Sequence, residues 1–270
     1  MQTVLITGAA GNIGGKLTAH FKATGAYDLR LLDRRAEGDI AAADFGDYDA
    51  SWAKRFAGVD TVFHLAGNPS GKTDWASAKR DNIGGTQHVL RAAREAKVRR
   101  VVFASTNQTM LGYRFRSGPV TTDLPPAPLS PYGISKFVGE ELGRAFHDET
   151  GIDFLALRIG YFQRGENLPG SHMEIGEWGQ SMWLSNRDMI QAAEKSIEAP
   201  AFGFAVVNLV SNNIGMRWDI EHTRKVIGYV PLDTATPVYT NVTRAADAAS
   251  RTKTIVPGTW FDEHFTVVEG

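Results

Sequence analysis

A glycine-rich turn near the start of the chain is the feature that most constrains its fold. The turn, Gly8-Ala9-Ala10-Gly11-Asn12-Ile13-Gly14, lies between the apolar run at residues 3–7 and a segment whose apolar side chains recur at helical spacing. The run predicts a buried strand, and the segment predicts a helix with Asn12 as a candidate cap. Strand, glycine turn and helix in this order are typical of a dinucleotide site, in which the pyrophosphate lies against the helix N-terminus.

An acidic residue stands where such a site recognises the adenosine ribose. A second apolar run ends in Asp33, about 20 residues beyond the turn, where a carboxylate accepts the ribose hydroxyls. Arg34 and Arg35 follow, and they suit an adenine, a 2′-phosphate or a solvated loop. Because Asp33 would repel a 2′-phosphate, we expect NAD to be preferred, with NADP as a weaker alternative through Arg34.

Strand-like and helix-like segments alternate along the first 160 residues. Strands are expected at 40–45, 61–66, 101–104 and 152–159, and helices at 82–96 and 132–150. This alternation predicts an α/β fold, a Rossmann-type doubly wound parallel sheet. We expect residues 1–165 to form the NAD-binding domain. Residues 166–270 are expected to form a small C-terminal substrate-binding cap, interleaved with the sheet as one structural unit.

Composition excludes several classes of function. The chain of 270 residues has a net charge of −1 and no cysteine. The balanced charge argues against nucleic acid or a membrane surface as partner, and no apolar run reaches the length of a transmembrane helix. Without cysteine there is no disulfide or thiolate metal site, and we expect no metal. We also expect no signal peptide and a cytoplasmic location.

A hydroxyl pair and a helix-borne tyrosine and lysine carry the candidate chemistry. Ser105-Thr106-Asn107-Gln108 ends the expected strand at 101–104, and Tyr132-Gly133-Ile134-Ser135-Lys136 opens a helix about 25 residues later. Tyrosine and lysine four residues apart lie on one helix face. A tyrosine at its ordinary pKa of about 10 is too weak a base to accept a carbinol proton, so a nearby cation would have to lower that pKa.

The chain resembles the extended short-chain dehydrogenase/reductases over residues 1 to about 165. Within that family it is most similar to uronate dehydrogenases and archaeal NAD-dependent glucose-6-phosphate dehydrogenases. The motifs are the glycine turn, F-A-S-T-N-Q-T, Y-G-I-S-K-F-V-G-E, R-I-G at 158–160 and G-Q-S-M-W-L-S at 179–185. The resemblance implies that Tyr132 is the base, that Lys136 stabilises its phenolate and binds the nicotinamide ribose, and that Thr106 holds the reacting oxygen.

The resemblance also implies the substrate, a cyclic aldose oxidised at C1 to the lactone. We expect an anionic group at C6, as in a sugar phosphate, sulfosugar or uronate, bound by Arg187 in preference to Arg164. In the place of the arginine that binds carboxylate in uronate dehydrogenases, this chain has Trp178 or Gly179. That departure favours a phosphate, a sulfosugar or a neutral hexose over a uronate.

The remaining expectations concern the other contacts of the site. Expected cofactor contacts are Gly8, Gly11, Asn12, Ile13, Gly14, Asp33, Arg34, Asp44, Phe45, Leu65, Ala66, Gly67, Asn82, Tyr132, Lys136 and Ile159. Expected substrate contacts are Ser70, Thr106, Asn107, Gln108, Tyr132, Tyr161, Gln180 and Arg187, with Arg164, His172, Trp178 and Trp183 as further cap residues. We expect His64 to be an interior histidine rather than a ligand.

Three readings of function stay open on the sequence. The first is an NAD-dependent sugar dehydrogenase. The second is a sugar epimerase, a dehydratase or a reductase of another small carbonyl compound, and the third is a dinucleotide-sensing regulator without catalysis. Tyr132 and Lys136 count against the third reading. Trp260, Phe261 and Phe265 in the tail suggest packing against another surface, and we expect a homo-oligomer.

Overall fold

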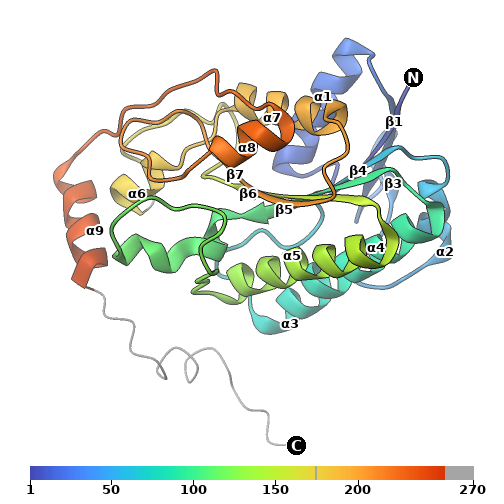
Figure 1. The fold of residues 1–270 in the computed structure, drawn as a ribbon, viewed down its shortest axis with the longest axis horizontal. Helices are drawn as coiled ribbons and strands as arrows, with labels where there is room; N and C mark the ends of the chain where they lie inside the picture. Colours follow the sequence, from blue (N-terminus) through green and yellow to red (C-terminus); the bar gives the residue numbers. More distant parts are fainter. Residues whose placement is uncertain (174, 253–270) are drawn as a thin grey trace, which may run out of the picture.

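The computed structural model describes residues 1–173 and 175–252 and confirms the parallel sheet (Figure 1). Within these residues seven strands pair in the order β3-β2-β1-β4-β5-β6-β7, every neighbouring pair parallel. The strands are β1 Thr3–Thr7, β2 Asp28–Asp33, β3 Ala41–Ala42, β4 Thr61–His64, β5 Arg100–Thr106, β6 Asp153–Ile159 and β7 Phe204–Leu209. The strand order reverses between β1 and β4, which is where such sheets bind ligands beyond the carboxyl ends of their strands.

Helices cover both faces of the sheet (Figure 1). One face carries α1 (Asn12–Thr24), α7 (Asn186–Glu198) and α8 (Glu221–Ile227), and the other carries α4 (Gly85–Ala96) and α5 (Pro131–Thr150). Each interface is a separate apolar core, built around Phe21 and Leu157 on the α1 side and around Phe103 and Phe154 on the α5 side. The shorter elements are α2 Ala50–Ala53, η1 Lys54–Phe56, α3 Trp75–Ser77, η2 Ala78–Gly84 and η3 Asn107–Phe115.

Several element boundaries differ from the expected ones. β4 ends at His64 and not at residue 66, and β5 extends from Arg100 to Thr106 beyond the expected 101–104. The strand expected at 40–45 is reduced to the two residues of β3, because the Asp44 carboxylate accepts the Gly46 N–H at 3.0 Å and turns the chain. The helix expected from residue 82 begins earlier as the π-helical segment η2 and continues directly into α4.

The start of α1 is left without a side-chain cap, so the candidate cap Asn12 was a wrong prediction. Gly11 occupies the N-cap position and makes no side-chain hydrogen bond, and Asn12 is the first residue of the helix. The Asn12 amide instead donates to the Gln163 carbonyl at 3.0 Å, which ties the turn to the segment that follows β6. An uncapped first turn leaves amide groups that can bind an anion.

The start of α5 is capped firmly. The Ser130 hydroxyl accepts the Gly133 N–H at 3.1 Å, and Pro131 occupies the first helical position, where its missing N–H costs nothing. This cap fixes the first turn of α5, so that Tyr132 and Lys136 lie one above the other on the same face.

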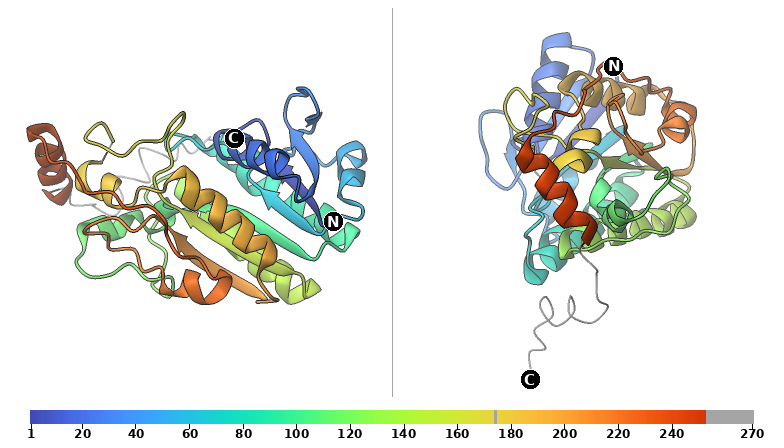
Figure 2. Two further views of the ribbon diagram at one scale, coloured as in Figure 1. Left: turned by 90° about the horizontal axis from the view of Figure 1, so that it is seen from above. Right: turned by 90° about the vertical axis from the view of Figure 1, so that its left-hand side faces the viewer.

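The chain beyond β6 builds a small region at the carboxyl ends of the strands. It contains α6 (Gly176–Ser181) and α9 (Asn241–Thr252), which Figure 2 shows gathered at one end of the sheet. The same stretch also returns to the sheet as β7, so it is joined to the Rossmann core. Trp260, Phe261 and Phe265 lie outside the described residues. No helix in the described part of the chain is long and apolar enough to cross a membrane.

Candidate active site

The glycine turn is built so tightly that two of its positions accept no side chain. Gly8 has a φ of +72°, and a Cβ there would lie 2.8 Å from the Ala66 backbone nitrogen. A Cβ on Gly14 would lie 2.1 Å from the Gly8 carbonyl oxygen. The start of α1 therefore packs directly on the turn, and the turn packs on the end of β4, which is the cradle that a pyrophosphate requires.

Asp33 is held in a fixed position at the end of β2. Its Oδ2 accepts the Ala10 N–H at 2.9 Å and its Oδ1 accepts the Arg34 N–H at 2.7 Å. A carboxylate fixed beside the glycine turn is the group that binds the ribose hydroxyls of NAD. The residues present therefore fit a dinucleotide.

The other expected cofactor residues lie along the same edge of the sheet. Leu65 and Ala66 donate their N–H groups to the Thr7 hydroxyl, both at 3.2 Å. Asn82 accepts the Asn68 N–H at 2.7 Å and donates to the Ser135 hydroxyl at 2.9 Å. Phe45 is buried, and Asp44 forms an ion pair with Arg80 at 2.9 Å. Ile159 ends β6 and is buried.

The three candidate catalytic side chains come from the end of β5, which ends in Thr106, and from the first turns of α5, which carry Tyr132 and Lys136. The Thr106 side chain lies close enough to the Tyr132 hydroxyl to lower its pKa, and the Thr106 hydroxyl accepts the Gln108 N–H at 3.2 Å. Thr106 is the acceptor in the bond with Gln108, so its own proton can be donated toward the Tyr132 oxygen. The Lys136 ammonium lies 4.8 Å from the centre of the Phe103 ring and 3.7 Å from where a Cβ of Gly67 would be.

Burial sets the protonation of this group. It raises the pKa of Tyr132 to about 12, against the lowering effect of the Thr106 hydrogen bond, and it lowers the pKa of Lys136 to about 8. Desolvation of the phenolate outweighs the Thr106 hydrogen bond. That Lys136 stabilises the phenolate stays a prediction. The pKa of the interior His64 falls to about 3, through burial and the Lys136 charge.

A buried ion pair beneath the site was not predicted from the sequence. Glu140 accepts two hydrogen bonds from Arg158, at 2.9 and 2.8 Å, and one from the Ser105 hydroxyl at 2.5 Å. All three residues are buried, and they join α5, β6 and β5. Ser105 thus faces the interior while Thr106 faces Tyr132. The sequence carries one signal for the position of Glu140: it follows Lys136 by one helical turn and therefore lies on the same helix face.

Several expected substrate residues surround this group. Gln108 lies beside the loop that follows β4, since a Cβ on Gly71 would lie 3.2 Å from its Nε2 atom. The neighbouring Ser70 accepts the Lys72 N–H at 3.2 Å and so shapes that loop. Asn107 is buried next to Thr106, and Tyr161 follows the end of β6, its N–H donating to the Met182 carbonyl at 2.7 Å.

Two expected substrate residues have their polar groups engaged elsewhere. Gln180 is 2% exposed, and its side-chain amide pairs with the Val238 backbone through bonds of 3.1 and 2.7 Å. Arg187 lies in the first turn of α7 with 66% of its side chain exposed, and both its Nε and its Nη2 contact the Asp233 carboxylate. The Arg187 guanidinium is therefore paired within the protein, as expected of a side chain that supports α7, and its role as the substrate cation stays a prediction.

The other cap residues divide between packing and surface. Trp178 is buried 5.3 Å from Trp218, and the Trp183 indole donates to the Asn167 carbonyl at 2.9 Å. His172 is exposed and contacts the Gln163 side chain at 2.9 Å, and Arg164 is exposed on the loop after β6.

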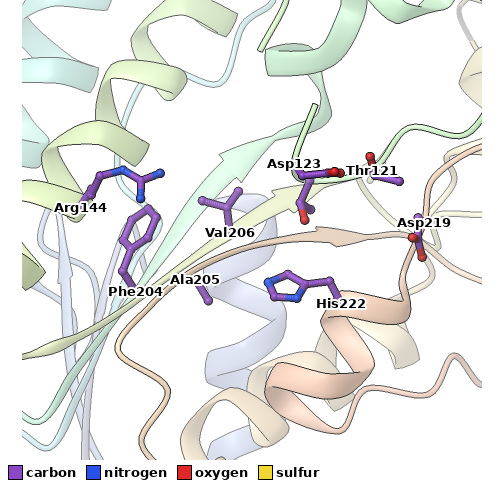
Figure 3. A pocket seen from close by; sticks show the side chains of 9 residues that line it. Thr121, Asp123, Arg144, Phe204, Ala205, Val206, Asp219 and His222 are labelled. Carbon is purple, nitrogen blue, oxygen red and sulfur yellow. The ribbon is translucent and has the colours of Figure 1, made fainter. Parts of the chain in front are cut away.

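A separate hollow of about 580 Å³ lies against β7 at the edge of the sheet (Figure 3). Asp123, Asp219 and His222 line it, and the Arg144 guanidinium lies 4.2 Å from the centre of the Phe204 ring at one end. None of its lining residues belongs to the expected site, so geometry places this hollow apart from the chemistry. Within residues 1–173 and 175–252 no group of three or more His, Cys, Asp or Glu side chains is placed to hold a metal.

Comparisons with known proteins agree with this geometry. Residues 4–163 match the sequence model of the NAD dependent epimerase/dehydratase family. The NAD-dependent glucose-6-phosphate dehydrogenase of Haloferax volcanii is 35% identical over 255 residues, covering 86% of this chain and 94% of that protein. The L-arabinose 1-dehydrogenase (NAD(P)(+)) of the same organism is also 35% identical, with 88% and 99% covered. The uronate dehydrogenase of Pseudomonas putida is 33% identical, with 86% and 84% covered.

Solved structures give the same picture. A mutated uronate dehydrogenase superposes with a TM-score of 0.76 at 28% identity, covering 94% of this chain and 88% of its own. A uronate dehydrogenase variant from Agrobacterium tumefaciens, complexed with NAD, has a TM-score of 0.73 at 27% identity, with 96% and 92% covered. By their names these relatives are sugar dehydrogenases, and NAD or NAD(P)(+) is named for three of them.

Proposed function

Because the chain belongs to the NAD-dependent epimerase/dehydratase family, we propose that it is an NAD-dependent sugar 1-dehydrogenase. The observation that carries this proposal is the position of Thr106, at the carboxyl end of β5, beside Tyr132 in the first turn of α5, with Lys136 one helical turn further on. A base, a hydroxyl that positions the substrate and a dinucleotide cradle at one edge are what the oxidation of a carbinol needs.

Each side chain has a defined part in the reaction. The Tyr132 oxygen takes the proton of the C1 hydroxyl, and the Thr106 hydroxyl holds the substrate oxygen beside it. Lys136 supplies positive charge close to the phenolate and binds the ribose of the cofactor. NAD, when bound, would supply the hydride acceptor and a positive ring that lowers the raised tyrosine pKa toward the working range.

The proposed substrate is a cyclic aldose that leaves as the lactone. Asn107 and Gln108 are placed to contact the ring hydroxyls, with Ser70 and Tyr161 at the sides. We propose an anionic group at C6, a phosphate, sulfonate or carboxylate, because relatives act on glucose 6-phosphate and on uronates. Arg164 becomes the preferred cation for this group, because Arg187 is already paired with Asp233.

A substrate screen tests the proposal. Aldoses, uronates, sugar phosphates and sulfosugars are each incubated with NAD, and NADH absorbance and lactone formation are measured. We expect one anionic hexose to give the highest kcat/KM. Preference for a neutral sugar would refute the anionic group alone. Sugar turnover without net NADH would instead identify the epimerase or dehydratase reaction, which the family also contains.

The proposal includes a cytoplasmic homo-oligomer. A chain without cysteine needs no oxidising compartment for its folding, which supports the cytoplasmic location. Light scattering coupled to size-exclusion chromatography tests the oligomeric state, and the mass of a single chain in solution would refute the homo-oligomer.

A further inference from the structure

The guanidinium of Arg34 is already engaged in the protein. Arg34 follows Asp33 directly, and its Nη2 lies 3.1 Å from Oδ1 of Asp81. The Arg34 side chain is 60% exposed, whereas Asp81 is only 13% exposed. The pair thus joins the end of β2 to the helical segment η2, which is distant in sequence.

Asp81 is held firmly, so Arg34 is the partner that is free to move. Oδ2 of Asp81 accepts the Ser77 hydroxyl at 2.9 Å, and Oδ1 also contacts Arg80 at 3.0 Å. Arg80 is in turn paired with Asp44 at 2.9 Å and with Asp47 at 2.7 Å. The network therefore runs along the adenosine end of the cofactor site.

We propose that Asp81 is a specificity-determining residue that withholds Arg34 from the 2′-phosphate of NADP. A 2′-phosphate would lie against the Asp33 carboxylate and would need a cation to offset that repulsion. Arg34 is adjacent in sequence and carries the donor fork that suits a phosphate. Binding NADP therefore requires that the Arg34–Asp81 pair be broken, a cost that NAD does not meet.

The exposure of the Arg34 side chain limits how much the Arg34–Asp81 pair contributes to discrimination against NADP. An ion pair with one exposed partner is a weak restraint, so Asp81 adds to the discrimination by Asp33 and does not replace it. Removing the Asp81 charge should lower the Kd for NADP about threefold to fivefold, the upper range for breaking an exposed ion pair, while the Kd for NAD stays within about twofold.

The test measures cofactor binding to the unliganded protein by isothermal titration calorimetry, with no sugar present. In Asp81→Asn the Kd for NADP is expected to fall and that for NAD to stay unchanged. Asp47→Asn is the matched control, because it removes an equal charge from the same network but contacts Arg80 and not Arg34. Circular dichroism checks that both variants are folded.

A second pair of variants isolates the role of Arg34. In an Arg34→Ala background, Asp81→Asn should leave the Kd for NADP unchanged. The proposal is overturned if Asp81→Asn alone leaves the Kd for NADP unchanged. It is also overturned if the Kd for NADP falls equally in Asp47→Asn, or if Asp81→Asn lowers it in the Arg34→Ala background. It rests on NAD as cofactor but not on the sugar. Failure of the wild type to bind NAD would refute the proposed function itself, whereas normal NAD binding with unchanged NADP binding would refute only the role of Asp81.

Discussion

The Thr106 side chain lies beside the Tyr132 hydroxyl and lowers its pKa, although the two residues belong to different elements. Thr106 ends β5, and Tyr132 lies in the first turn of α5, with the segment 107–130 between them. The fold itself therefore places side by side the two groups that must meet the reacting oxygen. Preorganisation of this kind lowers the entropic part of the barrier.

Tyr132→Phe should fold normally, bind NAD and lose about 10²–10⁴-fold in turnover, the usual contribution of a general base. Steady-state kinetics with the best sugar from the screen measure the loss, and calorimetry measures NAD binding. Tyr113→Phe is a suitable control, because Tyr113 is also buried but donates to the Pro125 carbonyl. Near-normal activity in Tyr132→Phe would show that Tyr132 is not the proton acceptor.

Thr106→Val, which removes the hydroxyl at similar volume, should lower kcat and cost only about 1 kcal/mol of the free energy of unfolding, through its lost bond to the Gln108 N–H. Ser105→Ala should leave kcat nearly unchanged and destabilise the fold more, since the Ser105 hydroxyl donates to buried Glu140 and faces away from Tyr132. Kinetics and urea denaturation of both variants check this contrast. A greater kinetic loss in Ser105→Ala would exchange the roles of the two hydroxyls.

Lys136 should make the unliganded protein less stable at neutral pH than at alkaline pH. Burial lowers its pKa from 10.5 to about 8. Between these values the unfolded chain binds more protons than the folded one, so the free energy of unfolding rises with pH through that window. Below pH 8 the full penalty applies, on the order of 3 kcal/mol.

Lys136→Met removes this penalty, so it should raise the free energy of unfolding at pH 7 and flatten its rise between pH 8 and 10.5. The variant should also lose NAD affinity and turnover. Denaturant titrations across pH, without cofactor, provide the measurement, with the exposed Lys79 replaced by Met as the control. A wild type whose stability does not rise over that range would contradict the buried, destabilised ammonium.

Glu140→Gln should destabilise the fold by about 3–5 kcal/mol, because it leaves the buried Arg158 guanidinium without a counter-charge. Thermal and urea unfolding measure the loss. The exposed pair between Arg94 and Glu149 gives the comparison, since Glu149→Gln should change stability little. An equal loss of stability in Glu140→Gln and Glu149→Gln would contradict a larger contribution of the buried pair to the free energy of unfolding.

Arg187→Ala should leave KM for an anionic sugar within about twofold of the wild type, because the side chain is exposed and bound to Asp233. Arg164→Ala should raise that KM and have little effect on the KM of the neutral parent sugar. Kinetics of both variants with both sugars check the assignment. A large increase confined to Arg187→Ala and the anionic sugar would restore Arg187 as the substrate cation.

The sequence predicted the parts of the molecule that depend on local pattern. The glycine turn, the carboxylate at Asp33 and the alternation of strands and helices each follow from short-range geometry, and the structure has the parallel sheet they predicted. The spacing of Tyr132 and Lys136 placed both on one face of a helix whose start Ser130 fixes.

What the sequence did not reveal depends on contacts between distant residues. The pairing of Glu140 with Arg158 and that of Gln180 with the Val238 backbone are set by tertiary packing. The same holds for the pair between Arg187 and Asp233, which are 46 residues apart. The high pKa of Tyr132 likewise reflects burial, which no local spacing reports.

The buried pair of Glu140 and Arg158 also bears on how this protein can change over time. Replacing either residue alone strands a charge in the interior, whereas replacing both by apolar residues of matching volume can be tolerated. The two positions are thus linked. Any series of single mutations from the ion pair to an apolar pair passes through a protein that holds one unpaired buried charge and is unstable. Asn107 and Gln108 on the neighbouring loop carry no such linkage to that pair, so we expect descendants that adopt new sugars to vary there while the pair beneath stays unchanged.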